Sequence, residues 1–223
     1  NPNECIEAVQ DSADVILAGN HDWAAIGKSA TDAFNPVALA AIRWTANRLQ
    51  PQHRAFLAAL PLLHAADDFL CVHATPQCPE AWDYIIDGDD AAVSFACFSQ
   101  QACFTAHSHV PRIFVRDKTC VALAEEKTVL RLRPEARYII NIGSVGQPRD
   151  GSAQAGYGIY DSVSGEYRCV RIPYDIAGAQ KKDRGPGCVP DPRPVDPDPG
   201  VRAISSRPPW CRGRRRSRSR TRS

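Results

Sequence analysis

Three short polar clusters in the chain each follow an apolar run and carry side chains that can bind metal ions or move protons. They are A-G-N-H-D-W after V-I-L, then F-L-C-V-H-A-T-P, then T-A-H-S-H-V-P. Their active members are Asn20, His21, Asp22, His73, His107 and His109. Neutral imidazole is a common ligand of divalent metals, and histidine is also a common general acid. These residue types therefore indicate metal binding or acid–base chemistry.

The pair His107 and His109 has a spacing that matters. On an extended segment, residues two apart point the same way, so both imidazoles could serve one metal ion or two adjacent ions. A fourth cluster, I-N-I-G-S-V-G-Q-P-R-D-G, has glycines that permit tight turns near a bound anion. Each motif alone is also compatible with a capped turn or a hydrogen-bonded buried histidine. The ordered set favours a site, because functional groups collect at strand ends in α/β sheets.

The elements that must position these side chains first alternate and then become mostly strands. A helix capped by Asn3, a strand over 14–18, helices over 36–49 and 52–60, a strand over 68–73 and a helix over 90–101 are expected. The expected helical stretches place His53 and His64 at the surface or at helix ends. From Cys103 onward, successive segments rich in β-branched and aromatic residues indicate strands. The pattern predicts an α/β domain with a second, largely antiparallel sheet.

Composition divides the chain near Lys182. Of the 27 basic side chains, nine are arginines within 201–223, which hold no acidic residue, so residues 1–200 carry 18 basic and 25 acidic side chains. We therefore expect a domain over 1–182 and a disordered tail rich in Pro, Gly and Arg over 183–223. The Arg/Ser run could bind nucleic acid through its phosphates. The same abrupt change would also result from out-of-frame translation of a GC-rich gene.

The nine cysteines are scattered and include no C-x-x-C pair, which indicates free thiols in a reducing, cytoplasmic setting. No apolar stretch approaches the roughly 18 residues that a membrane span needs. Oligomeric state is not indicated.

Taken in order, the motifs resemble those of the calcineurin-like metallophosphoesterase superfamily, above all its small bacterial phosphodiesterases and protein-phosphatase-like members. The resemblance covers roughly residues 1–175 and rests on G-N-H-D, V-H, A-H-S-H-x-P and G-S-V-G-Q-P-R. It implies an α/β/β/α sandwich and a hydrolase of phosphomonoesters or phosphodiesters, with a small molecule or a phosphoprotein as substrate. Trp82 and Tyr84, in A-W-D-Y, could stack a base or pack in the helix layer.

The same resemblance implies roles for the candidate residues. Asn20, His73 and His107 would ligate one divalent ion and His109 a second, with Mn, Fe, Zn, Ni or Mg all suitable. A hydroxide bridging the two ions would attack phosphorus. His21 would stabilise the phosphoryl oxygens and protonate the leaving oxygen, with Asp22 orienting its ring. Arg149 and Arg112 could contact the substrate phosphate or be solvated loop arginines.

Two earlier motifs of the superfamily, D-x-H and G-D-x-x-x-x-G, do not occur in the 223 residues. The resemblance thus implies that the chain begins after the second motif and lacks the first β-α-β unit. We expect an incomplete two-metal centre with little or no catalysis. The alternative is a non-catalytic binding module that keeps part of one metal site and uses its basic tail.

Overall fold

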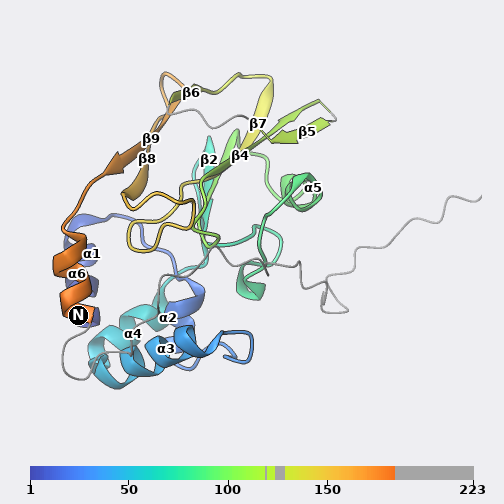
Figure 1. Ribbon diagram of the computed structural model, residues 1–223. Helices are drawn as coiled ribbons and strands as arrows, with labels where there is room; N and C mark the ends of the chain where they lie inside the picture. Colours follow the sequence, from blue (N-terminus) through green and yellow to red (C-terminus); the bar gives the residue numbers. More distant parts are fainter. Residues whose placement is uncertain (119, 124–128, 184–223) are drawn as a thin grey trace, which may run out of the picture.

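A six-stranded mixed sheet forms the centre of the computed structural model, which describes residues 1–118, 120–123 and 129–183 (Figure 1). In spatial order its strands are β1 (Leu63–Ala65), β2 (Phe69–Val72), β3 (Ala102–Thr105), β7 (Ala136–Asn141), β4 (Arg112–Asp117) and β5 (Cys120–Leu123). The central strands β2, β3 and β7 run parallel, and the outer pairings are antiparallel. The carboxyl ends of β2 and β3 therefore reach the same edge of the sheet and deliver His73 and His107 there.

A smaller antiparallel sheet covers one face of the first. It contains β6 (Val129–Arg131), β9 (Glu166–Ile172) and β8 (Ala155–Asp161), in that order. Tyr167 of this sheet packs with Tyr138 and Ile140 of the first in one buried cluster. The opposite face is covered by α5 (Gly88–Phe95), whose Phe95 packs into the core there. The mixed α/β fold and the second, antiparallel sheet are thus confirmed.

The remaining helices lie mostly in a separate group. They are α1 (Pro2–Ser12), α2 (Asn20–Ala25), α3 (Pro36–Arg48) and α4 (Pro51–Ala59), with a short 3₁₀ turn η1 (Pro79–Ala81) and α6 (Ile176–Asp183) elsewhere. Three of these helices begin at a proline, which suits the first helical position. The Asn35 side chain also caps α3 by accepting from the Ala38 N–H at 2.8 Å. Apolar side chains of α2, α3 and α4 pack against one another around Ile42. We call α2–α4 the helical cluster (Figure 1).

The prediction of a strand over 14–18 is wrong, because this segment belongs to neither sheet. It runs extended into α2, and the Ala18 N–H donates to the Pro61 carbonyl at 2.9 Å. The V-I-L run predicted a strand by its apolar character, but Val15 is 46% exposed and no strand pairs with the segment.

Several element predictions near the ends of helices were also wrong. Asn1, not Asn3, is the N-cap of α1, and the Asn3 side chain joins α1 to Arg48 and Gln50. The helix expected over 90–101 begins at Gly88, where Asp87 caps it, and ends at Phe95. Of the later strands, only β6, β8 and β9 form the second sheet.

Two histidines lie in other surroundings than expected. His64 is in β1 rather than in a helix. His53 is on α4 but buried, with its Nδ1 2.7 Å from Asn3 Oδ1 and its Nε2 3.4 Å from a Glu7 carboxylate oxygen. Of the predicted tail, residues 184–223 lie outside the described residues, and Asp183 ends α6. No helix in the described part of the chain is long and apolar enough to cross a membrane.

Candidate metal and phosphate site

Asn20 and His73 meet although they are 53 positions apart. Asn20 opens α2, His73 directly follows β2, and the His73 Nε2 lies 3.2 Å from the Asn20 Oδ1. Two ligands about 2.1 Å from one metal ion, at the angles of tetrahedral or octahedral geometry, lie roughly 3.0–3.4 Å apart. In the metal-free chain this contact is a hydrogen bond in which the His73 Nε2–H donates to the amide oxygen. Its length is also the spacing of neighbouring metal ligands, which Nε2 can join once its proton is released or moves to Nδ1.

Gly19 makes this approach possible. A Cβ atom at position 19 would lie 3.0 Å from Cε1 and 3.2 Å from Nδ1 of His73. A side chain there would therefore crowd the imidazole. The glycine of A-G-N-H-D-W thus lets the backbone before α2 pass close to the end of β2.

The H-x-H pair lies in a turn, which corrects the extended segment expected from the sequence. His107 and His109 have φ values of 60° and 61°, in the left-handed region that residues other than glycine rarely adopt. Trp82 shares this conformation with a φ of 57°. Such residues are held by their surroundings and cluster at functional sites. The Asn141 side chain donates to the Ala106 carbonyl and, at 3.0 Å, to the Ser108 hydroxyl, which holds the turn in place.

Each imidazole of the pair has one ring nitrogen bound to a backbone carbonyl. His107 Nε2 donates to the Trp82 carbonyl at 2.8 Å, and His109 Nδ1 donates to the Gln147 carbonyl at 2.8 Å. A carbonyl only accepts, so the bonded nitrogen carries the proton and the other nitrogen keeps its lone pair. Metal-binding histidines usually have such a partner on their second nitrogen. The pair is therefore oriented to offer His107 Nδ1 and His109 Nε2.

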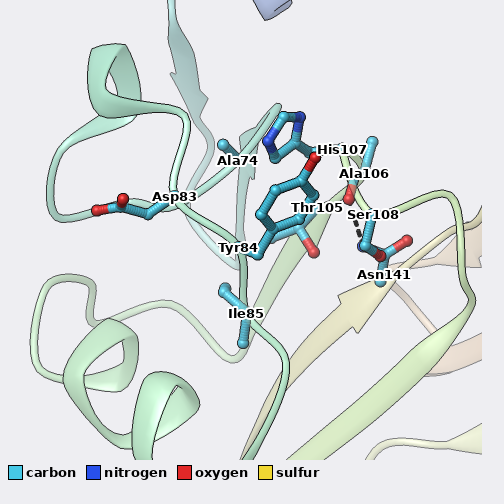
Figure 2. Close-up of a pocket in the computed structure, with 9 residues that line it drawn as sticks. All are labelled: Ala74, Asp83, Tyr84, Ile85, Thr105, Ala106, His107, Ser108 and Asn141. Carbon is cyan, nitrogen blue, oxygen red and sulfur yellow. Dashed lines mark hydrogen bonds between the residues drawn. The ribbon is translucent and has the colours of Figure 1, made fainter. Parts of the chain in front are cut away.

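Aromatic rings enclose the histidines. Tyr84 stacks on His107 with the ring centres 4.1 Å apart. Figure 2 shows the two side chains next to each other. Trp82 meets His73 edge-on at 5.9 Å and Trp23 at 5.5 Å. The A-W-D-Y stretch thus contacts the site itself, in a loop rather than in the helix layer. The carbonyls of Trp82 and Gln147, which bind the ring nitrogens of His107 and His109, could not be predicted from the sequence, because every residue has a backbone carbonyl.

Burial governs the charge of these imidazoles. It lowers the pKa of His73 to about 4 and that of His107 to about 3, with further lowering by neighbouring histidines. Burial also lowers the pKa of His109, as does the positive charge of Arg149. The metal-free site therefore holds neutral histidines at neutral pH, which is the form that binds metal.

His21 and Asp22 open onto the same region. Burial of the His21 ring, although the residue is exposed overall, lowers its pKa more than the charge of Asp22 raises it. Asp22 Oδ2 accepts from the Gly19 N–H at 2.8 Å, and burial raises the pKa of this carboxyl group. The carboxylate thus caps α2, while the His21 ring lies edge-on to Phe34 with the ring centres 5.0 Å apart.

The two candidate arginines lie in different surroundings. Arg149 is exposed, its guanidinium donates to Gln147 Oε1 at 2.9 Å, and its charge lowers the pKa of His21. Arg112 donates from Nη1 to the Ile86 carbonyl at 2.5 Å. Arg149 therefore has the position of a group that can meet an anion at the site.

The donor set fits a divalent metal ion in part. Among the described residues, no three His, Cys, Asp or Glu side chains are close enough together to hold an ion by themselves. One ion here would need the amide oxygen of Asn20 beside His73 Nε2 and the free nitrogen of His107, and a second ion would need the free nitrogen of His109. Imidazole and amide donors suit several divalent transition metals.

No family model matches the chain. It is similar to the uncharacterized protein MJ0912 of Methanocaldococcus jannaschii, with 36% identity over 187 residues, which are 82% of this chain and 74% of that protein. The solved structure of a metallophosphoesterase from Sphaerobacter thermophilus has 38% identity and a TM-score of 0.70, covering 83% of this chain and 77% of that one. The hypothetical protein PH1004 of Pyrococcus horikoshii, 14% identical with a TM-score of 0.60 over 81% and 71% of the two chains, shares the fold.

Proposed function

Since the chain belongs to the calcineurin-like metallophosphoesterases, we propose that it hydrolyses a phosphomonoester or phosphodiester with the help of divalent metal ions. The observation that carries the proposal is the 3.2 Å spacing of Asn20 Oδ1 and His73 Nε2. The backbone contacts that leave His107 Nδ1 and His109 Nε2 free support it. The substrate would be a small molecule or a phosphoprotein, and the protein would act in the cytoplasm.

In this proposal Asn20, His73 and His107 hold one ion, and His109 contributes to a second. Bound metal supplies positive charge to the phosphoryl oxygens and lowers the pKa of water. His21 binds a phosphoryl oxygen and, protonated from water when the negative charge of the substrate raises its pKa, donates that proton to the leaving oxygen as imidazolium, while Asp22 holds the start of α2 on which His21 stands. The exposed guanidinium of Arg149 binds a further phosphate oxygen.

We also propose that the two-metal centre of the 223-residue chain is incomplete. Among its residues only His109 is assigned to the second ion, because the chain contains neither D-x-H nor G-D-x-x-x-x-G. Phosphoryl transfer depends on charge neutralisation and positioning, so loss of most ligands of one ion lowers the rate severely. The chain is then expected to bind metal but to turn over slowly or not at all.

Two measurements on the purified chain test these proposals separately. Mn²⁺ titration followed by calorimetry should give one tight site, and Asn20→Ala or His73→Ala should weaken it by more than the roughly 10- to 100-fold that loss of a ligand's hydrogen-bond partner costs. Asn47→Ala, in α3, is the matched control and should leave the affinity unchanged. A wild-type chain that binds no Mn²⁺, or variants that bind as well as wild type, would contradict the metal-dependent function.

Hydrolysis of bis-p-nitrophenyl phosphate and p-nitrophenyl phosphate with Mn²⁺ tests the state of the centre. The expected rate is close to the rate with EDTA. Robust turnover that disappears in His21→Asn but not in His64→Asn would contradict the incomplete centre and support the assignment of His21. His64 is a fair control because it lies in β1, paired with Cys71 and away from the H-x-H turn.

A further inference from the structure

The imidazole of His107 is held by one loop, residues 82–86, from two directions. The Trp82 carbonyl accepts the Nε2–H at 2.8 Å, and the Tyr84 ring stacks on the imidazole with an angle of 17° between their planes. Figure 2 shows Tyr84 lying against His107 at the ends of the strands. The loop thereby sets both the tilt of the imidazole and the nitrogen that carries its proton.

The 82–86 loop has neither helical nor strand hydrogen bonding, so its position depends on how its far end is held. Ile85 is buried in the core beside α5, and the Ile86 N–H donates to the Asp90 carboxylate at 3.0 Å. The Ile86 carbonyl accepts from Arg112 Nη1 at 2.5 Å. Charged donors make stronger hydrogen bonds than neutral ones, so the Arg112 contact is a strong anchor.

Arg112 is itself rigidly placed. It is the first residue of β4 and pairs in register with Asn141 of β7, whose side chain holds the H-x-H turn. One strand pair therefore positions both His107 and the guanidinium that fixes the loop lying over it. Movement of the loop relative to the histidine is restricted from both sides.

We propose that Arg112 is a positioning residue for His107: by binding the Ile86 carbonyl, it keeps the 82–86 loop against the imidazole and fixes the Nε2–H tautomer. The use of the free Nδ1 as a metal ligand rests on the proposed function, whereas the tautomer does not. Arg112 thus acts through the loop and not on a substrate phosphate.

The first test reads the tautomer directly in the metal-free, full-length chain. Long-range ¹H–¹⁵N correlation spectra at pH 7.5 should show His107 in the Nε2–H form in wild type and a mixture of both forms in Arg112→Met. Arg112→Lys, which keeps a charged donor, should restore the Nε2–H form. Arg116→Met is the matched control, because Arg116 lies on the same strand and also donates to a backbone carbonyl, that of Phe95 at 3.4 Å. An unchanged His107 pattern in Arg112→Met overturns the proposal.

If far-UV circular dichroism shows that Arg112→Met is unfolded, Tyr84→Ala takes its place, because Tyr84 is 39% exposed and its loss leaves the core intact. Tyr84→Ala should also mix the two tautomers, and Tyr84→Phe should not. A wild-type pattern in Tyr84→Ala then overturns the proposal.

The second test uses Co²⁺ alone, followed by its visible absorption. Arg112→Met should bind Co²⁺ roughly 10- to 100-fold more weakly than wild type, with recovery in Arg112→Lys. A higher KM for p-nitrophenyl phosphate with unchanged tautomer and Co²⁺ affinity would assign Arg112 to the substrate and overturn the proposal. A wild-type chain with the Nε2–H form but no metal affinity would contradict the proposed function alone.

Discussion

Burial decides which residues of the site are ready to bind metal. His73 and His107 are neutral because their imidazoles lie among other histidines and aromatic rings, away from water. This arrangement lowers the free energy of unfolding in acid, because the histidines of the unfolded chain bind protons at a pH at which those of the folded chain do not.

The metal-free chain should therefore lose stability as pH falls below about 6.5. The pKa of His73 is about 4 when folded and 6.5 when unfolded, so its contribution is complete above 6.5 and lost by about 4. This shift alone corresponds to something on the order of 3 kcal/mol. Asp22, whose pKa burial raises, offsets part of the loss near pH 4.

Urea unfolding at a series of pH values checks this expectation. The midpoint should fall between pH 7 and 4, and His73→Asn should make the curve less steep, with the lowered pKa of His107 giving the remaining slope, while His64→Asn should leave it unchanged. A midpoint independent of pH in this range, with EDTA present throughout, would show that His73 is protonated as easily in the folded chain as in the unfolded one.

At this scale the sequence predicted the donors but not what orients them. Asn20 and His73 could be identified because polar side chains follow apolar runs, and the structure brings their side chains together. The Trp82 and Gln147 carbonyls could not, since a backbone group leaves no mark in the residue type.

Among the elements, the start of α2 carries the tightest constraint. Gly19 is the N-cap of α2, and a Cβ atom at this position would lie 3.0 Å from Cε1 of His73, so a side chain here would press on the imidazole. The sequence indicated a strand leading directly to these residues. No strand pairs with 14–18. The position of Asn20 is therefore fixed by the short helix α2 and by the Asp22 carboxylate that caps it.

Gly19→Ala should weaken Mn²⁺ binding about 10-fold while costing less than about 1 kcal/mol of unfolding free energy, since its φ of −105° suits alanine. The physical reason is that the added Cβ displaces the His73 imidazole. Calorimetric titration and urea unfolding measure the two effects. Gly146→Ala is the matched control, because its Cβ would meet no atom within 4 Å. Equal affinities for the two variants would show that the His73 ring adjusts freely.

For the whole molecule, two arginines of the sheet join α5 to it, Arg116 of β4 and, with more contacts, Arg137 of β7. Arg137 of β7 donates to the Phe95 carbonyl at 3.1 Å, the Gln100 carbonyl at 3.2 Å and the Phe98 carbonyl, and its guanidinium lies 4.4 Å from the Phe98 ring centre. The Phe95 carbonyl is at the end of α5, and the Phe98 and Gln100 carbonyls are in the loop that follows it. The contact therefore closes the layer that covers this face of the sheet.

Arg137→Met should lower the free energy of unfolding by roughly 2 kcal/mol, because it leaves the Phe98 and Gln100 carbonyls without a charged donor, while the Phe95 carbonyl keeps Arg116. Arg168→Met should cost less than about 1 kcal/mol, since Arg168 is half exposed and paired only loosely with Glu166 at 3.5 Å. Urea unfolding of both variants measures the difference. Similar values would mean that water replaces Arg137 at these carbonyls.

The α/β class and the later strands could be predicted from the sequence because apolar periodicity and β-branched residues mark them. The division into sheets could not, since the same patterns suit a strand in either sheet. The strand β7 is an example. Its residues Tyr138, Ile139 and Ile140 are all buried, on alternate faces, because β7 lies inside the large sheet with both faces covered. The strand β4 pairs with β7 and therefore belongs to the same sheet.

The contact between Asn20 and His73 also joins the helical cluster to the edge of the sheet. The helices α2–α4 pack mainly on one another, so in the absence of metal the cluster can open by local fluctuation without disturbing the strands. An ion held by both Asn20 and His73 would couple the opening of the helical cluster to the opening of the sheet at the end of β2, so that the two would occur together. Amide hydrogen exchange in α2 and at the end of β2 should then slow together when Mn²⁺ is added, while exchange in β6 and β9 stays as it was.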